Sequence, residues 1–308
     1  MDRYRFDGRV AVVTGAGRGI GRAYARLLGR RGASVVVNDR GGAIDGAGAD
    51  AGPASTVAAE IVAAGGAAIA DGSDVATPAG AQALVDAAVA RFGRLDVVIN
   101  NAGIIRWAGL PDADADNLAR HLDVHVGGSF HTTRAAWPHM VAQGYGRVVM
   151  TTSSGIFGLP TNTSYATAKA AVIGLTRSLR TQGAKHGIKV NLIAPAAMTR
   201  MAGPPAGGGD DAVGAEDDPM SPDLVAPIVA FLAHEDCPVS GEIYAAGAGR
   251  FARIFVAQTE GYVHAGPPPS IEDVAAHWDT INDERGYTIP ADLGAWSKAF
   301  LAHLRADG

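Results

Sequence analysis

A tyrosine and a lysine, Tyr165 and Lys169, stand four residues apart in the run SYATAK at 164–169. On a helix this spacing places both side chains on one face, one turn apart. A phenol is a weak acid, with a reference pKa of about 10, and a neighbouring ammonium favours its ionised form and lowers that pKa. We therefore expect the pair to act as a general acid/base that moves a proton to or from an alcohol oxygen. The alternative is a half-buried tyrosine beside a solvated lysine.

A glycine-rich segment, TGAGRGIG at 14–21, follows the first predicted strand and opens a helix. Gly15, Gly19 and Gly21 give it the spacing G-x-x-x-G-x-G. Glycines permit a tight turn and let backbone N–H groups approach a pyrophosphate at the positive end of the helix. The segment lacks the Gly-Lys-Ser/Thr ending of an NTPase phosphate loop. It therefore predicts a nucleotide site of another kind.

Two carboxylates follow the second and third predicted strands. Asp39 is placed to accept both ribose hydroxyls and to repel a 2′-phosphate, which favours NAD over NADP. Arg40 follows at once and would soften that preference. An ordinary turn aspartate at a strand end is the alternative for Asp39. Asp74 is placed either to accept from an adenine amino group or to begin a turn.

Polar runs also end the fourth and fifth predicted strands. NNAG at 100–103 lies where doubly wound sheets bind ligands, and asparagines there either fix the cofactor loop or cap the next segment. TTSS at 151–154 offers hydroxyls that would polarise a substrate carbonyl or hold an alcohol, or would simply form a turn.

The elements that must position these residues alternate along the chain. Strands are predicted at 10–13, 34–37, 67–70, 96–99, 147–150, 189–193 and 242–245, and helices at 20–31, 54–64, 79–92, 114–143, 164–186 and 222–234. Such alternation implies βαβ units, hence a Rossmann-type, doubly wound α/β fold: a parallel sheet of about seven strands with helices on both faces. Further helices are predicted at 271–283 and 291–304. We expect an NAD-binding domain over 1–250 and a helical C-terminal extension over 251–308 that packs on the same domain or on a neighbouring subunit.

The composition limits the function classes. The 308 residues carry a net charge of -5, which offers no basic field for nucleic acid or an anionic membrane, and no apolar run reaches membrane-spanning length. Cys237 is the only cysteine, so no intramolecular disulfide can form and a cytoplasmic location is expected. The Gly/Pro-rich, acidic segment 202–222 is predicted to be a surface flap over the substrate.

Taken together and in this order, these motifs resemble the signature of the short-chain dehydrogenase/reductase family over residues 6–248. The resemblance implies an enzyme acting on CH–OH groups, with Tyr165 as the acid/base. It also implies that Lys169 binds the nicotinamide ribose and lowers the tyrosine pKa. The family's substrate-orienting serine falls on Thr152 when counted back from the tyrosine and on Ser153 when counted from the strand. We favour Ser153 and keep Thr152 as the alternative.

The resemblance also implies a set of cofactor contacts, with NAD as the expected cofactor. They fall on Gly15, Arg18, Gly19, Ile20, Gly21, Asp39, Asp74, Val75, Asn101, Ala102, Gly103, Tyr165, Lys169, Pro195 and Met198.

One family position is changed. The family's catalytic asparagine, in Val-Asn-Leu-x-Gly, is replaced by His125 in VHVGG at 124–128. In the family that asparagine holds a water in a proton relay from the lysine, and an imidazole can hydrogen-bond the same water. A satisfied core histidine is the alternative. His121 and His125 have the spacing of a metal pair, but no third ligand is evident and no metal is expected.

A finer resemblance accounts for the histidine. RFDGRV at 5–10, VND-x-GG at 37–42, VHV-x-GSF at 124–130, TRAAW-x-HM at 133–140 and HE-x-C at 234–237 occur together. They are similar to the (3R)-hydroxyacyl-CoA dehydrogenase domain of the peroxisomal multifunctional enzyme type 2 family.

This finer resemblance implies conversion of 3-hydroxyacyl-CoA, with a fatty or steroid side-chain acyl group, to 3-oxoacyl-CoA. The alternatives are a dehydrogenase of steroids or other bulky alcohols without CoA and, from another class, a non-catalytic NAD(H)-sensing protein. The family is commonly oligomeric, so a homodimer or homotetramer is expected.

Overall fold

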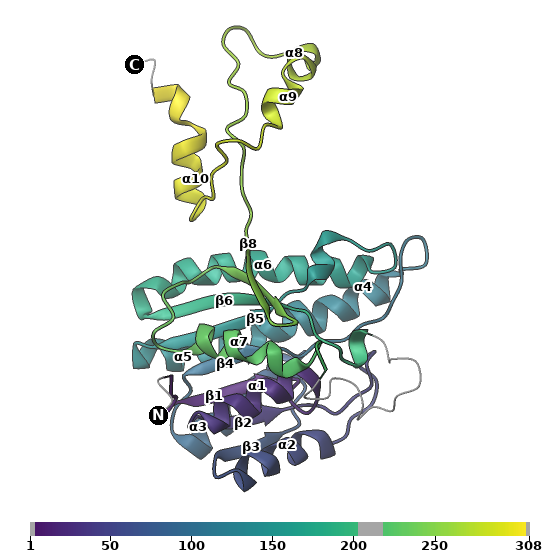
Figure 1. Ribbon diagram of the computed structural model, residues 1–308, viewed down its shortest axis with the longest axis vertical. Helices are drawn as coiled ribbons and strands as arrows, with labels where there is room; N and C mark the ends of the chain where they lie inside the picture. The colour runs from purple at the N-terminus through teal and green to yellow at the C-terminus, as the bar shows by residue number, and fades with distance from the viewer. Residues whose placement is uncertain (1–3, 203–217, 306–308) are drawn as a thin grey trace. The chain divides into compact units, whose positions relative to one another are not determined.

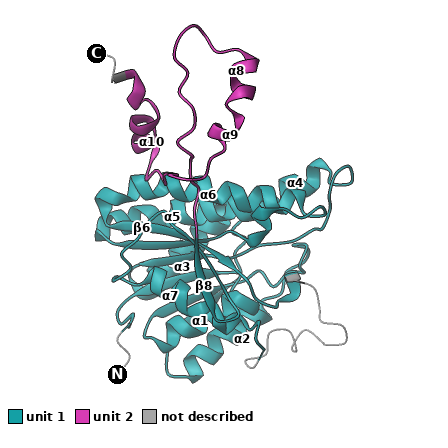
Figure 2. Cartoon of the chain, turned by 45° about the horizontal axis from the view of Figure 1, so that its top comes forward, with its two compact units in different colours: residues 1–253 teal, residues 254–308 magenta. Residues whose placement is uncertain are grey.

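The structure is a computed structural model that describes residues 4–202 and 218–305. The chain divides into two compact units, Met1–Arg253 and Ile254–Gly308 (Figure 2). Most of the predicted flap over 202–222 lies outside the described residues.

Unit 1 is built on one sheet with the strand order β3-β2-β1-β4-β5-β6-β7-β8 (Figure 1). The strands are β1 Val10–Thr14, β2 Ser34–Asn38, β3 Ala67–Asp71, β4 Val97–Asn100, β5 Gly146–Thr151, β6 Ile188–Pro195, β7 Ile243–Gly247 and β8 Arg250–Ile254. The neighbours from β3 to β7 are all parallel. The order reverses between β1 and β4, which is the topological switch point where such sheets bind ligands. The predicted Rossmann-type fold is confirmed.

Helices cover both faces of this sheet (Figure 1). They are α1 Gly19–Arg30, α2 Gly52–Ala63, α3 Pro78–Phe92, α4 Ala115–His121, α5 Gly128–Gln143, α6 Thr163–Gly183 and α7 Ala226–Ala233. Every residue of β1, β4 and β5 is shielded from solvent, as expected for strands packed on both faces. The apolar runs that predicted these strands form the core.

The predicted helix over 114–143 is continuous but changes its winding. A π-helical turn, η1 Leu122–Gly127, joins α4 to α5 and carries His125. Single π-helical turns inside α-helices are rare and occur frequently at functional sites. Hydrophobic periodicity alone gives no signal for such a turn.

An eighth strand was not predicted. Ala248 and Gly249 both have positive φ, 49° and 73°, and form a two-residue turn from β7 into β8. A turn of this kind reverses the chain, so β8 returns antiparallel at the edge of the sheet. The sequence did not predict this turn because its first position is alanine, and non-glycine residues seldom adopt positive φ.

Unit 2 contains the short helices α8 Ile271–Ala276, α9 Trp278–Ile281 and α10 Leu293–Phe300. Both helices predicted for this region are therefore broken or shorter than expected. Within it Trp296 stacks on Phe300 with ring centroids 4.7 Å apart. None of the residues 255–304 is fully buried, and side chains such as Ile271 and Leu293 are exposed. Among the helices that the structure describes, none combines the length and apolar character needed to span a bilayer.

Candidate active site

A groove of about 1030 Å³ lies at the C-terminal ends of β1, β2 and β4. We call it the cofactor groove. It is lined by all the predicted cofactor contacts except Tyr165, Lys169, Pro195 and Met198. Gly17, Thr199 and Arg200 also line it and were not predicted as contacts. Thr199 lies over the glycine segment, since a Cβ built on Gly19 would sit 3.5 Å from its Cγ2.

The glycine segment is fixed to the end of β4. The Asn101 side chain donates to the carbonyls of Thr14 and Gly15, each at 3.0 Å. In return the Thr14 hydroxyl accepts from the backbone N–H groups of Asn101 and Ala102, each at 3.0 Å. A Cβ on Gly15 would lie 2.8 Å from the Ala102 Cα, so only glycine fits. Of the two alternatives for Asn101, the structure supports the one in which it fixes the cofactor loop.

Asp39 joins the glycine segment to the loop after β2. Its carboxylate accepts from the N–H of Gly17 at 2.8 Å and from the N–H of Gly41 at 2.6 Å. A Cβ on Gly17 would lie 2.8 Å from a carboxylate oxygen of Asp39, which explains the glycine there. A carboxylate has room for further donors such as ribose hydroxyls. The glycine cradle and this acceptor fit the adenosine and pyrophosphate half of a dinucleotide.

Arg40 forms an ion pair with Asp74. Its Nη1 lies 3.1 Å from an Asp74 carboxylate oxygen. The other Asp74 oxygen accepts from the N–H of Ala76 at 3.1 Å, so Asp74 also forms a turn. The pair lines the groove and offsets the positive charge that would attract a 2′-phosphate.

Tyr165 and Lys169 lie one turn apart near the start of α6. The Lys169 side chain is buried; its Nζ donates to the Thr151 carbonyl at 2.9 Å and lies 5.6 Å from the Tyr165 ring centroid. Burial lowers the pKa of Lys169 to about 7. Burial also raises the pKa of Tyr165, and a hydrogen bond with the Ser153 side chain opposes that rise. The pKa of Tyr165 is therefore raised overall, where a lowering was predicted, because burial has a larger effect than the Ser153 hydrogen bond.

The two hydroxyls at the end of β5 have different surroundings. Ser153 bonds Tyr165 and its Oγ also accepts from the N–H of Gly155 at 3.0 Å. The Thr152 hydroxyl is buried and donates to the Lys169 carbonyl at 2.7 Å. Thr152 thus fastens the strand to α6, while Ser153 lies next to the phenol.

His125 is buried beside the same phenol. Its ring stands edge-on to the Tyr165 ring, with centroids 5.3 Å apart. Its Nε2 lies 2.9 Å from the Ile104 carbonyl, which only accepts, so Nε2 carries the proton. Nδ1 is then a bare acceptor, and it has no partner among the described residues. Burial, with Lys169 adding to it, holds the pKa of His125 well below its usual range, so the imidazole is neutral.

Two further observations concern this histidine. A Cβ on Gly103 would lie 2.6 Å from the His125 ring, so the glycine of the NNAG motif makes room for the imidazole. His121 stacks on His125, but both rings bond backbone groups of the neighbouring loop rather than converging on a common point. No group of three metal-ligating side chains occurs in the part of the chain that the structure describes.

Comparison with known proteins agrees with this arrangement. The family model for short chain dehydrogenases matches residues 9–204. The chain belongs to this family. It is 43% identical to a putative short-chain type dehydrogenase/reductase of Mycobacterium tuberculosis, over 91% of this chain and 96% of that protein.

Two other relatives bear on the function. The chain is 42% identical to peroxisomal multifunctional enzyme type 2 of Mus musculus, over 94% of this chain but only 38% of the mouse protein. A solved 7α-hydroxysteroid dehydrogenase, complexed with NADH and 7-oxo glycochenodeoxycholic acid, has a TM-score of 0.68 and 29% identity over 80% of this chain and 95% of its own. The protein is therefore an oxidoreductase that acts on CH–OH groups with a nicotinamide cofactor.

Proposed function

We propose that the chain is an NAD-dependent dehydrogenase that interconverts 3-hydroxyacyl-CoA and 3-oxoacyl-CoA. The observation that carries the chemistry is the contact of Tyr165 with Ser153 and His125, at the end of the sheet where the cofactor groove lies. Similarity to the mouse multifunctional enzyme over nearly the whole chain supports the acyl-CoA class. His125 in place of the family's usual asparagine supports it further.

Ser153 and Tyr165 have different roles in the proposed proton transfer. A nicotinamide dinucleotide, when bound, accepts or supplies the hydride. Ser153 Oγ holds the alcohol oxygen, and Tyr165 as phenolate takes its proton. Because burial raises the pKa of Tyr165, the protonated phenol predominates at neutral pH. That form is the proton donor for ketone reduction, so alcohol oxidation should speed up as the pH rises.

Lys169 and His125 connect the phenol with its surroundings. Lys169 would bind the nicotinamide ribose, and a pKa of about 7 lets it exchange protons near neutrality. The neutral His125 presents Nδ1 as an unpartnered acceptor, which suits a hydrogen bond from a water molecule in a proton chain to solvent. The remaining predicted contacts, Pro195 at the end of β6 and Met198 after it, are proposed to border the nicotinamide half.

We assign the cofactor as NAD because Asp39 lies in the groove and Asp74 pairs with Arg40. Placing two like charges together costs several kcal/mol, which corresponds to at least about 10²-fold in kcat/KM against NADP. Asp39→Asn should reduce the ratio of kcat/KM with NAD to kcat/KM with NADP at least tenfold. A preference of the unaltered enzyme for NADP would overturn the assignment.

Two exposed aromatic side chains, on segments next to Ser153 and to the start of α6, are available to a bulky apolar group. Trp107 is 51% exposed and Phe157, which follows Ser153 in a short helical turn, is 75% exposed. A bridge joins Ala108, the residue after Trp107, to Asn162, three residues before Tyr165. Arg200 lines the groove and would serve CoA phosphates, whereas Arg106 is paired with Asp116 at 2.7 Å.

The substrate class is tested with NAD and three panels: 3-hydroxyacyl-CoA esters, the same acyl groups on a truncated thiol, and hydroxysteroids. We expect the highest kcat/KM with the CoA esters and a drop on truncation. Higher kcat/KM with a steroid would favour the second candidate, for which the solved hydroxysteroid dehydrogenase is the supporting relative. Tight NAD binding without turnover of any alcohol would instead indicate the NAD(H)-sensing protein.

Two broader proposals accompany this function. Residues 255–304 have no fully buried side chain, so we propose that this extension is covered by unit 1 or by a neighbouring subunit in a homodimer or homotetramer. A light-scattering mass equal to one chain would overturn the oligomer. For localisation, the cytoplasm remains our proposal.

A further inference from the structure

Two histidines, one at the end of α4 and one in the π-helical turn, hold alternate residues of the segment 104–106. His125 Nε2 donates to the Ile104 carbonyl at 2.9 Å, and His121 Nε2 accepts from the N–H of Arg106 at 3.3 Å. The two rings are stacked, with centroids 5.9 Å apart and an interplanar angle of 12°. The pair therefore fixes the register of the segment 104–106 against the helix.

His121 itself has no part in the proton chemistry proposed above. It is fully buried, and its Nδ1 donates to the Asn117 carbonyl at 2.7 Å, which leaves Nε2 as the acceptor for Arg106. The Asn117 side chain in turn donates to the Arg106 carbonyl at 3.1 Å. Both backbone groups of Arg106 are thus held by one turn of α4. The His121 ring also stands edge-on to Tyr165, with centroids 6.1 Å apart.

The segment held in this way joins the cofactor groove to the acid/base. It begins after Gly103, which lines the groove. It ends at Ala108, whose carbonyl accepts from the N–H of Thr163 at 3.3 Å, just before Tyr165 on α6. Trp107, within this segment, is half exposed. A shift of Arg106 would therefore move the backbone that links the groove to the start of α6.

We propose that His121 is a positioning residue for the alcohol substrate: by holding the Arg106 backbone it fixes the segment 104–108 beside the start of α6, which carries Tyr165. The substrate part of this inference rests on the proposed function. The hold on Arg106 does not, and it has its own measurement.

The variants separate the hydrogen bond from the bulk of the ring. His121→Leu fills a similar space without an acceptor for Arg106. His121→Asn keeps a donor for the Asn117 carbonyl but is too short to reach Arg106, so it loosens the segment with less damage to folding. His121→Gln returns an acceptor near the position of Nε2 and should rescue.

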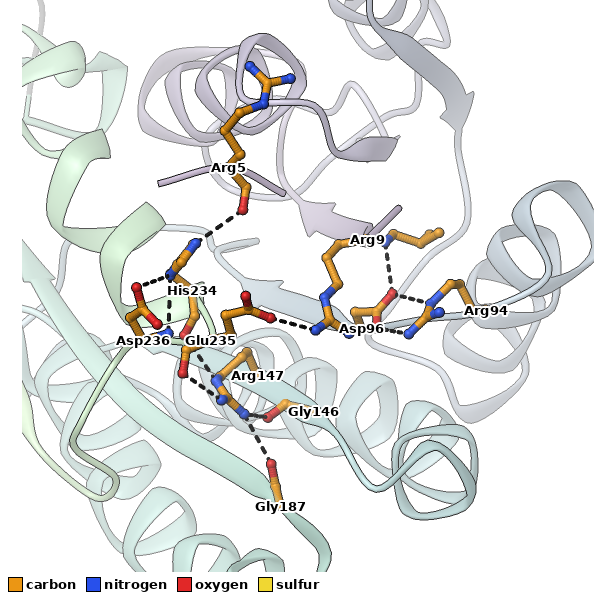
Figure 3. A network of polar contacts seen from close by, with 11 residues as sticks. Arg5, Arg9, Arg94, Asp96, Gly146, Arg147, Gly187, His234, Glu235 and Asp236 are labelled. Atoms are coloured by element: carbon orange, nitrogen blue, oxygen red, sulfur yellow. Dashed lines mark hydrogen bonds and ion pairs between the residues drawn. The ribbon is translucent and has the colours of Figure 1, made fainter. Parts of the chain in front are cut away.

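A matched control is available at the opposite edge of the sheet. His234 is also buried, and its two ring nitrogens bond the Arg5 carbonyl and the N–H of Asp236, each at 3.1 Å (Figure 3). His234→Leu therefore removes a comparable buried imidazole away from the site.

Hydrogen exchange followed by mass spectrometry tests the hold. Peptides covering 104–108 should exchange about fivefold faster or more in His121→Leu and His121→Asn, the factor expected for one lost hydrogen bond. They should exchange as in the unaltered protein in His121→Gln and His234→Leu. Unchanged exchange of 104–108 in both loosening variants would overturn the proposal.

Steady-state kinetics test the consequence. In His121→Asn the KM for the alcohol should rise about fivefold, the kcat should stay within about twofold, and the KM for NAD should not change. An equal rise of the KM for the alcohol in His234→Leu would overturn the positioning role. A fall in kcat without a change in KM would overturn it too. An unaltered enzyme that turns over no alcohol would refute the proposed function and the substrate part of this inference, while the exchange result would still decide whether His121 holds Arg106.

Discussion

The two edges of the sheet differ in whether their buried polar groups have hydrogen-bond partners. At the N-terminal edge of the strands, the buried Arg147 donates to four backbone carbonyls, those of Gly146, Gly187, His234 and Glu235 (Figure 3). The buried Asp96 beside it accepts from Arg9, from Arg94 and from the N–H of Val10. Among the residues that the structure describes, no side-chain atom of this network is buried without a partner.

At the C-terminal edge, several buried groups are left unsatisfied. Nδ1 of His125, the hydroxyl of Thr151 and the side-chain oxygen of Asn100 have no partner among the described residues. Lys169 is as deeply buried as Arg147 but is held through a single backbone carbonyl. Buried polar groups are normally satisfied, and exceptions gather at functional sites. The comparison indicates that the first edge stabilises the fold while the second keeps hydrogen-bonding capacity for ligands.

The hydroxyls after β5 test the division between the two edges through activity. Ser153→Ala should lower kcat about 10²–10³-fold, as removal of an oxygen-holding donor does. It should also shift the rise of alcohol oxidation to higher pH, because the lost hydrogen bond was lowering the pKa of Tyr165. Thr152→Val removes only the hydrogen bond to the Lys169 carbonyl and should lower kcat less than tenfold. Steady-state kinetics across pH measure both, and a larger loss in Thr152→Val would reverse the assignment.

At the opposite edge, Arg147→Met should reduce stability rather than activity. The substitution leaves four carbonyls without their donor, and a buried unsatisfied group costs about 1–3 kcal/mol. We expect the free energy of unfolding, measured in urea, to fall by at least about 3 kcal/mol, with kcat unchanged where the variant is folded. A loss of kcat without a loss of stability would contradict the division between the edges.

Lys169 and Arg147 should also differ in how stability depends on pH. Burial lowers the Lys169 pKa from 10.5 to about 7, so between these values the unfolded chain binds more protons than the folded one. The free energy of unfolding therefore rises with pH in that window, by up to about 1.4 kcal/mol per pH unit from this residue. Lys169→Met should abolish this rise, and Arg147→Met should keep it. If the free energy of unfolding rose equally with pH in Lys169→Met and in the unaltered protein, Lys169 would not be the source of the rise.

Residues next to strand ends could be predicted from the sequence because their order along the chain and the fold class determine where they meet. The glycine segment, Asp39 and the NNAG motif lie along one groove for this reason. The choice between Thr152 and Ser153 needed the structure. Neighbouring residues of an extended chain point to opposite faces, and the sequence does not say which face meets Tyr165.

Other features depend on tertiary packing and had no local signal. The spacing of Tyr165 and Lys169 predicts proximity, but the direction of the tyrosine pKa shift depends on burial, which outweighs the Ser153 hydrogen bond. The hold of His121 on Arg106 requires the π-helical turn and the loop to be placed together. Gly17 stood in the predicted glycine segment, yet its tight contact with Asp39 appears only when β1 and β2 pair.

The most direct test of the account is NADH formation by the unaltered enzyme and by Tyr165→Phe with the best alcohol of the three panels. A general acid/base contributes about 10²–10⁴-fold, so the variant should lose at least that much in kcat. NADH binding, followed by fluorescence, should remain within a few-fold because the hydroxyl alone is removed. An unchanged kcat in Tyr165→Phe would contradict the proposed chemistry of this site.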